Sequence, residues 1–175
     1  MRRTLIAVAL VAMVALAGCS ALTGGDAADT DRPGATVSDD RVAVENDDAG
    51  ATGVNQTLRL AVDETTNGSE WTAIGATYPR ENFTVDSAQH GEIALGVDTD
   101  DDGELDREFN ESHVSGVNNN AYSFDVTLDT DYTLSEGDVV VVGYPAVDNP
   151  AEPGDYEVDV RVNDRQNATG TVTIE

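Results

Sequence analysis

An alternation of apolar and polar residues recurs from about residue 54 onward, and it constrains the fold more than any other feature. Seven short segments carry it: 57–62, 71–78, 92–97, 122–128, 139–144, 156–162 and 170–174. Successive side chains of a β-strand point to opposite faces, so a period of two predicts strands with one buried face. Turn-forming pairs such as Asn67-Gly68 and Pro153-Gly154 separate the segments. The pattern predicts an all-β domain over residues 54–175.

Seven short strands separated by turns are typical of an antiparallel sandwich of two sheets. We expect the apolar face of 122–128 to line one sheet and that of 156–162 to line the other. The run Val139–Val142 does not alternate, which predicts a central strand covered on both faces.

The end of the chain carries a resemblance. Pro153-Gly154-Asp155-Tyr156 leads a strand with valine at alternate positions, and Thr171-Val172-Thr173-Ile174 closes the next one. This pattern resembles the final hairpin of immunoglobulin-like and fibronectin-like modules in archaeal surface proteins. It covers about residues 137–175, and it implies an immunoglobulin-like sandwich.

The first residues of the chain have the features of an export signal. Arg2 and Arg3 precede thirteen apolar residues, Leu5 to Ala17. A charged start, a short apolar segment and a small-residue cleavage site are typical of a signal peptide, here residues 1–18, and thirteen residues are too few to span a bilayer.

The single cysteine, Cys19, follows directly, in the order Leu16-Ala17-Gly18-Cys19. This order resembles the lipobox of prokaryotic lipoproteins. The resemblance implies cleavage before Cys19, a thioether from its thiol to a glycerolipid, and a mature protein held on the outer face of the cell membrane. The alternative is a plain secretory peptide with an incidental cysteine. With one cysteine there is no internal disulfide.

Residues 19–53 are expected to form the lipidated end and a flexible acidic linker. From Ser20 the chain is rich in Gly, Ala, Asp, Thr and Ser, and it cannot bury enough apolar surface to offset the entropy lost on ordering. The alternative is a short edge strand built on Val37, Val42 and Val44.

The charge of the chain is strongly one-sided. Its formal net charge is −25, and loss of Arg2 and Arg3 with the signal peptide leaves seven arginines against 34 acidic residues, or −27. All basic residues are arginine and none is lysine. Such a charge density opposes compaction at ordinary ionic strength, whereas at about 1 M salt the screening length falls to roughly 3 Å. We therefore expect a molar-salt environment.

This composition resembles that of proteins from extremely halophilic archaea. An acidic disordered tail is the competing explanation, but it fails after residue 54, where strand patterning begins. Nucleic acid is disfavoured as a partner, because phosphate binding needs clustered basic residues.

One segment carries a candidate metal site. Asp98, Asp100, Asp102, Glu104 through its carbonyl, and Asp106 stand at positions one, three, five, seven and nine of a loop with Gly103 at position six. Ca²⁺ takes six to eight oxygen ligands arranged around a sharp turn.

The segment resembles the calcium loops of EF-hand and dockerin-like proteins, which implies a structural Ca²⁺. It departs from them at position twelve, where Phe109 replaces a bidentate glutamate and Glu108 or Glu111 would have to substitute. The alternative is an acidic β-turn without metal, since Asp-x-Asp is common in so acidic a chain.

Five Asn-x-Ser/Thr sequons are candidate glycosylation sites, and each lies at a predicted turn or strand edge: Asn55, Asn67, Asn82, Asn110 and Asn167.

The sequence contains little that indicates an enzyme. His90 and His113 stand alone in polar segments, and no familiar metal or nucleophile motif includes them. We expect a non-enzymatic, lipid-anchored surface module with an envelope, adhesion or protein-interaction role, contacting a surface protein or a glycan. An accessory ligand- or metal-binding lipoprotein serving a transporter or redox system is the alternative. A hydrolase would require either histidine beside a serine or carboxylate in a cleft.

Overall fold

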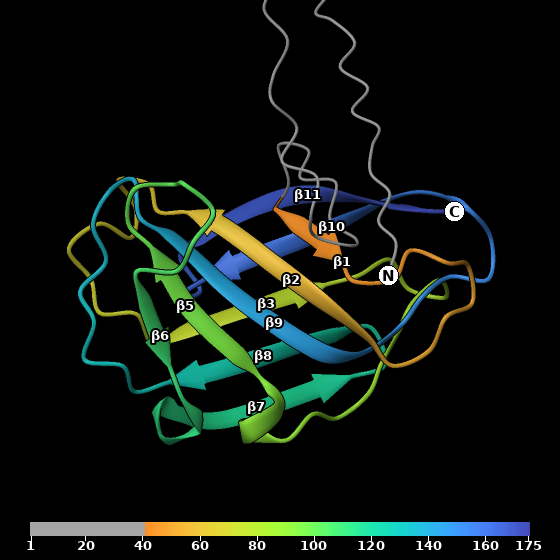
Figure 1. Cartoon of the computed structure of the whole chain (residues 1–175), viewed down its shortest axis with the longest axis horizontal. Helices are drawn as coiled ribbons and strands as arrows, with labels where there is room; N and C mark the ends of the chain where they lie inside the picture. The colour runs from red at the N-terminus through yellow and green to blue at the C-terminus, as the bar shows by residue number, and fades with distance from the viewer. Residues whose placement is uncertain (1–40) are drawn as a thin grey trace, which may run out of the picture. The chain divides into compact units, whose positions relative to one another are not determined.

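The computed structural model describes residues 41–175, and every regular element in them is a β-strand or a short 3-10 turn (Figure 1). In chain order these are β1 (Val42–Val44), β2 (Val54–Ala61), β3 (Ala73–Thr77), β4 (Thr84–Val85), η1 (His90–Glu92), β5 (Ala94–Asp98), β6 (Arg107–Phe109), η2 (Glu111–His113), β7 (Val114–Asn120), β8 (Ser123–Leu128), β9 (Val139–Asp148), β10 (Gly154–Val162) and β11 (Gln166–Ile174). All seven predicted strands are present, and the predicted all-β class is confirmed. Within 41–175 no helix has the length and apolar character needed to cross a membrane.

The first sheet is organised around β9. Its order is β1-β2-β9-β5-β6, and β4 also pairs with β9. Val141 of β9 lies opposite Arg59 of β2 on one side and Gly96 of β5 on the other. The residues from Val139 to Val142 are all at most 8% exposed, so the prediction of a central strand covered on both faces is confirmed.

The second sheet has the order β11-β10-β3-β8-β7, and all its pairs are antiparallel. The expectation that 122–128 and 156–162 line opposite sheets is wrong, because β8 and β10 both flank β3. Ile74 of β3 pairs with Val126 on one side and with Val162 on the other. A period of two identifies the buried face of a strand but carries no information about its neighbours.

The core lies between the apolar faces of the two sheets, which form the two layers visible in Figure 1. Phe124 of β8 stacks on Tyr144 of β9 with ring centroids 3.9 Å apart and planes 7° from parallel. Both side chains are fully buried, as is Trp71. Aromatic rings bury large apolar areas, so this contact joins the sheets near their centres.

The folded body begins before residue 54. β1 pairs with β2, and a methyl group added at Gly170 of β11 would lie 3.0 Å from Val42 Cγ2. Hydrogen bonds also join Ala49 and Asp47 to Glu175. The predicted end of the linker at residue 53 is therefore too late, and the alternative edge strand is the one observed at Val42 and Val44. Residues 1–40, with Cys19 and Val37, lie outside the described residues.

Three further strands were not predicted, because their sequences show no clear alternation of apolar and polar residues. β4 and β6 are two and three residues long, and β7 reads Val-Ser-Gly-Val-Asn-Asn-Asn, with few apolar residues. Such segments form strands because a neighbouring strand supplies hydrogen-bond partners, which local patterning does not record.

Phe124→Ala tests the inter-sheet contact. Removal of the ring leaves a cavity against Tyr144, and we expect the free energy of unfolding to fall by about 3–5 kcal/mol. Thr171→Ala, at an exposed position of β11, is the control and should change it by no more than about 0.5 kcal/mol. Urea unfolding in molar NaCl measures both, and equal midpoints for the two variants would contradict the packing.

Candidate functional site

The acidic segment forms the loop that joins β5 to β6. Asp98 is the last residue of β5 and pairs with Val139 of β9, while Val97 pairs with Arg107 of β6. Gly103 has a φ of +91°, a conformation that favours glycine over other residues. The sharp turn expected at the sixth loop position is therefore present.

The loop covers part of the outer face of the first sheet. Arg59 alternates with buried leucines along β2, so it and its partner Val141 face away from the core. Gly96 flanks Val141 on the other side, and a Cβ built there would lie 2.5 Å from Leu105 Cδ1. Leu105 thus lies directly over Gly96, and a side chain at that position would displace the loop.

Asp98 lies beneath this cover and is fully buried. Its Oδ2 accepts hydrogen bonds from Arg59 Nη2 at 2.7 Å and from the Gly103 amide at 2.9 Å. Its Oδ1 is also buried and has no hydrogen-bond partner. These two donors fix the orientation of the carboxylate. The Asp101 amide also lies close to it but forms no hydrogen bond to Oδ1, which has no partner.

Opposing effects act on the pKa of Asp98. Desolvation raises the pKa, but the Gly103 amide, the Arg59 guanidinium and the Asp101 amide lower it, and their sum outweighs desolvation. The pKa of Asp98 therefore lies below its ordinary value, and the group is ionised at neutral pH.

Asp100 and Asp106 bring two further carboxylates to the same place. One oxygen from each of Asp98, Asp100 and Asp106 lies within 4.8 Å of the others. The Thr99 hydroxyl and amide donate to Asp106 Oδ2 at 2.6 and 2.8 Å and lower the pKa of Asp106. The pKa of Asp100 is raised, chiefly by the charge of Asp102. The loop therefore holds mutually repelling anions close together.

Of the four carboxylates predicted as ligands, the structure groups three, and the predicted role of the Glu104 carbonyl stays a prediction. Asp102 lies outside the group, and its Oδ1 accepts the Glu104 amide at 2.9 Å. At the twelfth loop position, Phe109 packs edge-on against Trp71 with centroids 5.6 Å apart. The sequence analysis did not predict the ion pair of Arg59 with Asp98, because Arg59 lies on β2 and belongs to no motif near the acidic segment.

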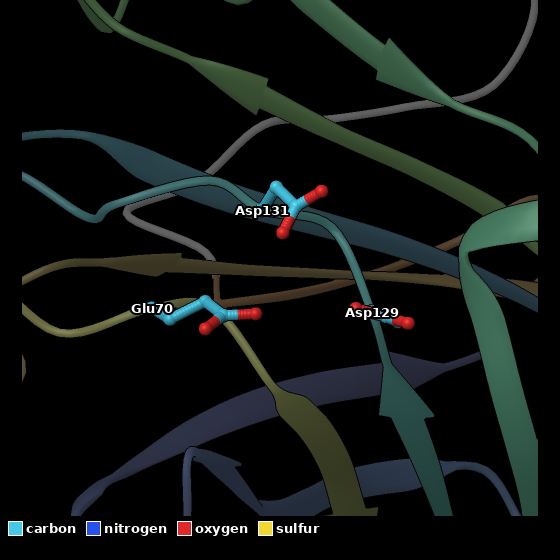
Figure 2. Close-up of side chains that lie close together, drawn as sticks. All are labelled: Glu70, Asp129 and Asp131. Carbon is cyan, nitrogen blue, oxygen red and sulfur yellow. The ribbon is translucent and has the colours of Figure 1, made fainter.

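A second acidic group lies elsewhere in the described residues. Glu70 and the segment after β8, with Asp129 and Asp131, bring their carboxylates within 4.8 Å of one another (Figure 2). All three residues are exposed. The pairing of Glu70 with Thr133 brings these segments together. Glu70 and Asp129 are 58 residues apart in the sequence, counting only those between them, so no local motif indicates the group.

The surroundings of the two histidines bear on the hydrolase alternative. His113 Nδ1 accepts the Asn110 amide at 3.3 Å, and its ring packs edge-on against Phe109 at 5.4 Å. In residues 41–175 no hydrogen bond joins the ring of His90 or His113 to a serine hydroxyl or a carboxylate.

An open concavity of about 420 Å³ adjoins the acidic loop. It is lined by Ala94, Leu95, Leu105, Glu108, Phe109 and Asn110. Trp71 is buried in the core and does not line this concavity, and no tyrosine lines it either.

The predicted glycosylation sites differ in exposure. Asn67, Asn82, Asn110 and Asn167 are exposed, whereas Asn55 is half-buried, with its Oδ1 3.4 Å from the position of a Cβ on Gly143. Since a glycan must project into solvent, the exposed four are the better acceptors.

Asp98→Asn tests the contribution of the buried carboxylate. Because the folded-state pKa of Asp98 lies below the unfolded value of about 3.9, the ionised group stabilises the fold at neutral pH, and this stability is lost as the pH falls through the folded pKa. We expect the wild type to exceed the variant in stability at pH 7 and the difference to shrink below about pH 4.

Urea unfolding in molar NaCl with a chelator, from neutral to acid pH, measures this difference. Glu157→Gln, at an exposed position of β10, is the charge-matched control and should give a smaller difference. A difference between wild type and Asp98→Asn that stays constant with pH would contradict the stabilising role of the carboxylate.

The chain matches no protein-family model and no curated protein sequence. Among solved structures it is similar to BslA, a bacterial hydrophobin (14% identity, TM-score 0.43, 77% of this chain and 94% of that one), and to the group B streptococcus pilus 2b backbone protein (13%, 0.45, 77% and 56%). A third is a Nocardia farcinica protein described as having an immunoglobulin-like fold (16%, 0.37, 77% and 96%). Likenesses of this degree carry no conclusion about the ligand, partner or activity of this chain.

Proposed function

We propose that this protein is a lipoprotein on the outer face of the cell membrane, and that its β-sandwich is a non-enzymatic module that contacts another surface protein or a glycan. The observation that carries the proposal is the position of the only cysteine, Cys19, directly after Leu16-Ala17-Gly18 at the end of an apolar run. A diacylglycerol-type anchor has two chains, which hold a protein to a bilayer stably where one chain does so only marginally.

The distribution of side chains on the sandwich favours an interaction module over an enzyme. Five of its aromatic side chains, including Trp71, Phe124 and Tyr144, are buried in the core. There Phe124 stacks on Tyr144, and Trp71 contacts the half-buried Phe109. Its exposed strand positions are mostly small, polar or acidic; on β10, Asp155, Glu157 and Asp159 all face solvent. Such a polar surface suits a broad interface with a polar partner. A small substrate is usually bound in a concave pocket lined mainly by apolar side chains.

The same surface supports a molar-salt environment. Within residues 41–175 the ion pairs centre on two arginines, Arg59 with Asp98 and Asp101, and Arg161 with Asp125 and Asp164. Most of the other carboxylates are solvated and repel one another. Screening at about 1 M salt shortens the range of that repulsion to roughly 3 Å.

The second candidate is an accessory metal- or ligand-binding lipoprotein serving a transporter or redox system. The observation that favours it is the group formed by Asp98, Asp100 and Asp106, because three carboxylates within 4.8 Å of one another suit a hard cation.

Membrane fractionation together with intact-mass measurement tests the proposed anchor. We expect the wild-type chain in the membrane fraction, cleaved before Cys19 and heavier than the mature polypeptide by a glycerolipid. Cys19→Ser should remove the added mass and release the protein from the membrane, while Ser20→Ala should leave both unchanged. A wild-type chain recovered from the cytosol with a free Cys19 thiol would overturn the proposal.

A further inference from the structure

The buried oxygen Asp98 Oδ1 is an unpaired anionic atom inside the described part of the chain. The other buried side-chain atoms without a partner are neutral: both amide atoms of Gln56, Trp71 Nε1, Tyr78 Oη and Asn149 Oδ1. An ionised oxygen without a partner is the most costly of these to bury, since a charge loses more on desolvation than a neutral dipole does. Arg59 pairs with the other oxygen of this carboxylate, so Oδ1 is the atom left for a further donor or cation.

The Arg59 guanidinium does not meet this need. Its Nη2 lies 2.7 Å from Asp98 Oδ2, the oxygen that also accepts the Gly103 amide, and its next carboxylate is Asp101 at 3.8 Å. Arg59 and Gly103 thus hold the carboxylate in one orientation, with the free oxygen available to another group.

The neighbouring carboxylates have the spacing that a shared cation requires. Oxygen ligands at 2.3–2.6 Å from one Ca²⁺ can be at most about 5 Å apart. The oxygens of Asp98, Asp100 and Asp106 lie within 4.8 Å of one another. All three are therefore close enough to share a single ion after small side-chain movements.

We propose that the β5–β6 loop binds one Ca²⁺, with Asp98 Oδ1 as its buried ligand and the carboxylates of Asp100 and Asp106 as its exposed ligands. This site names the cation for the metal-binding candidate function and does not depend on the lipid anchor. Water and backbone carbonyls complete the six to eight oxygens that Ca²⁺ takes.

The ligand chemistry favours Ca²⁺ over other cations. The three side chains offer only carboxylate oxygen, whereas Zn²⁺ is held chiefly by sulfur and nitrogen. Mg²⁺ demands a near-ideal octahedron, which an open loop of this kind does not impose. Because Phe109 packs into the core where an EF-hand has its bidentate glutamate, the affinity belongs with the weak extracellular modules, with a Kd of about 10⁻⁴–10⁻³ M.

Bound Ca²⁺ would connect the end of β5 to the start of β6. Asp98 is the last residue of β5, and Asp106 directly precedes β6. An ion between them holds closed the loop that places Leu105 over Gly96 of β5. The site would thus stabilise the β5–β6 connection at the edge of the first sheet.

The group of Glu70, Asp129 and Asp131 supplies a matched control. It has the same number of carboxylates at the same spacing, but all are exposed and none has a buried unpaired oxygen. It carries no proposal of its own.

Titration of the full-length chain, as isolated, with CaCl2 tests the proposal. In molar NaCl after chelator removal, calorimetry gives the stoichiometry and thermal unfolding gives the stabilisation. We expect one Ca²⁺ per chain and a melting temperature that rises with CaCl2 concentration. Asp100→Asn should raise the Kd by about tenfold or more, and Asp129→Asn should leave it unchanged.

Asp100 is the chosen position because its exposed side chain can change without loss of the fold, and neutralising it also relieves repulsion from Asp102 in the metal-free loop. We therefore expect Asp100→Asn to melt at a higher temperature than wild type in chelator and at a lower one in saturating CaCl2. An NMR shift of the Gly103 amide on CaCl2 addition, absent from Asp100→Asn, places the ion in the loop.

Three results would overturn the proposal: no response of the wild type to CaCl2, an equal response of Asp100→Asn, or loss of the response in Asp129→Asn. An equal response to MgCl2 at the same concentration would overturn the assignment to Ca²⁺. None of these bears on Cys19, and failure of the anchor would leave the Ca²⁺ titration unaffected.

Discussion

Strand β9 is the constraint on which the rest of the fold depends. It pairs with β2 along one edge and with β5 along the other, so it joins the two halves of the first sheet. Its valines are buried on both faces. Tyr144 meets Phe124 of the second sheet on the inner side, and on the outer side Val141 lies between Arg59 and Gly96, over which Leu105 of the β5–β6 loop packs. A strand covered on one face only would leave this apolar run in water.

The β5–β6 loop also explains the position of Asp98. The loop begins with this residue, which pairs with Val139 of β9, and both residues are buried. Arg59 reaches it across β9 and satisfies one of its oxygens. The chain thus handles its negative charge in two ways: by solvation and salt screening at the surface, and by pairing with cations where a carboxylate is enclosed.

The pattern of apolar and polar residues along the chain was sufficient to predict the fold class, the seven main strands and the central position of Val139–Val142. Each of these features depends only on which residues are apolar. It was insufficient for strand neighbours, and β8 and β10 were assigned to different sheets although both flank β3. β1 is stabilised by β2 and β11, which its own sequence does not show. In the site, the spacing of Asp98, Asp100 and Asp106 was visible, but the unpaired oxygen and the role of Arg59 depend on contacts between distant strands.

The most direct test of this account is a crystal structure in molar salt with CaCl2, in which the anomalous signal of calcium is measured. It shows whether the buried oxygen Asp98 Oδ1 binds a cation. We predict one calcium peak at about 2.3–2.6 Å from Asp98 Oδ1, with Asp100 and Asp106 among its other ligands. An Asp98 carboxylate that is open to solvent, or whose Oδ1 is hydrogen-bonded within the protein with no calcium peak beside it, would contradict this account.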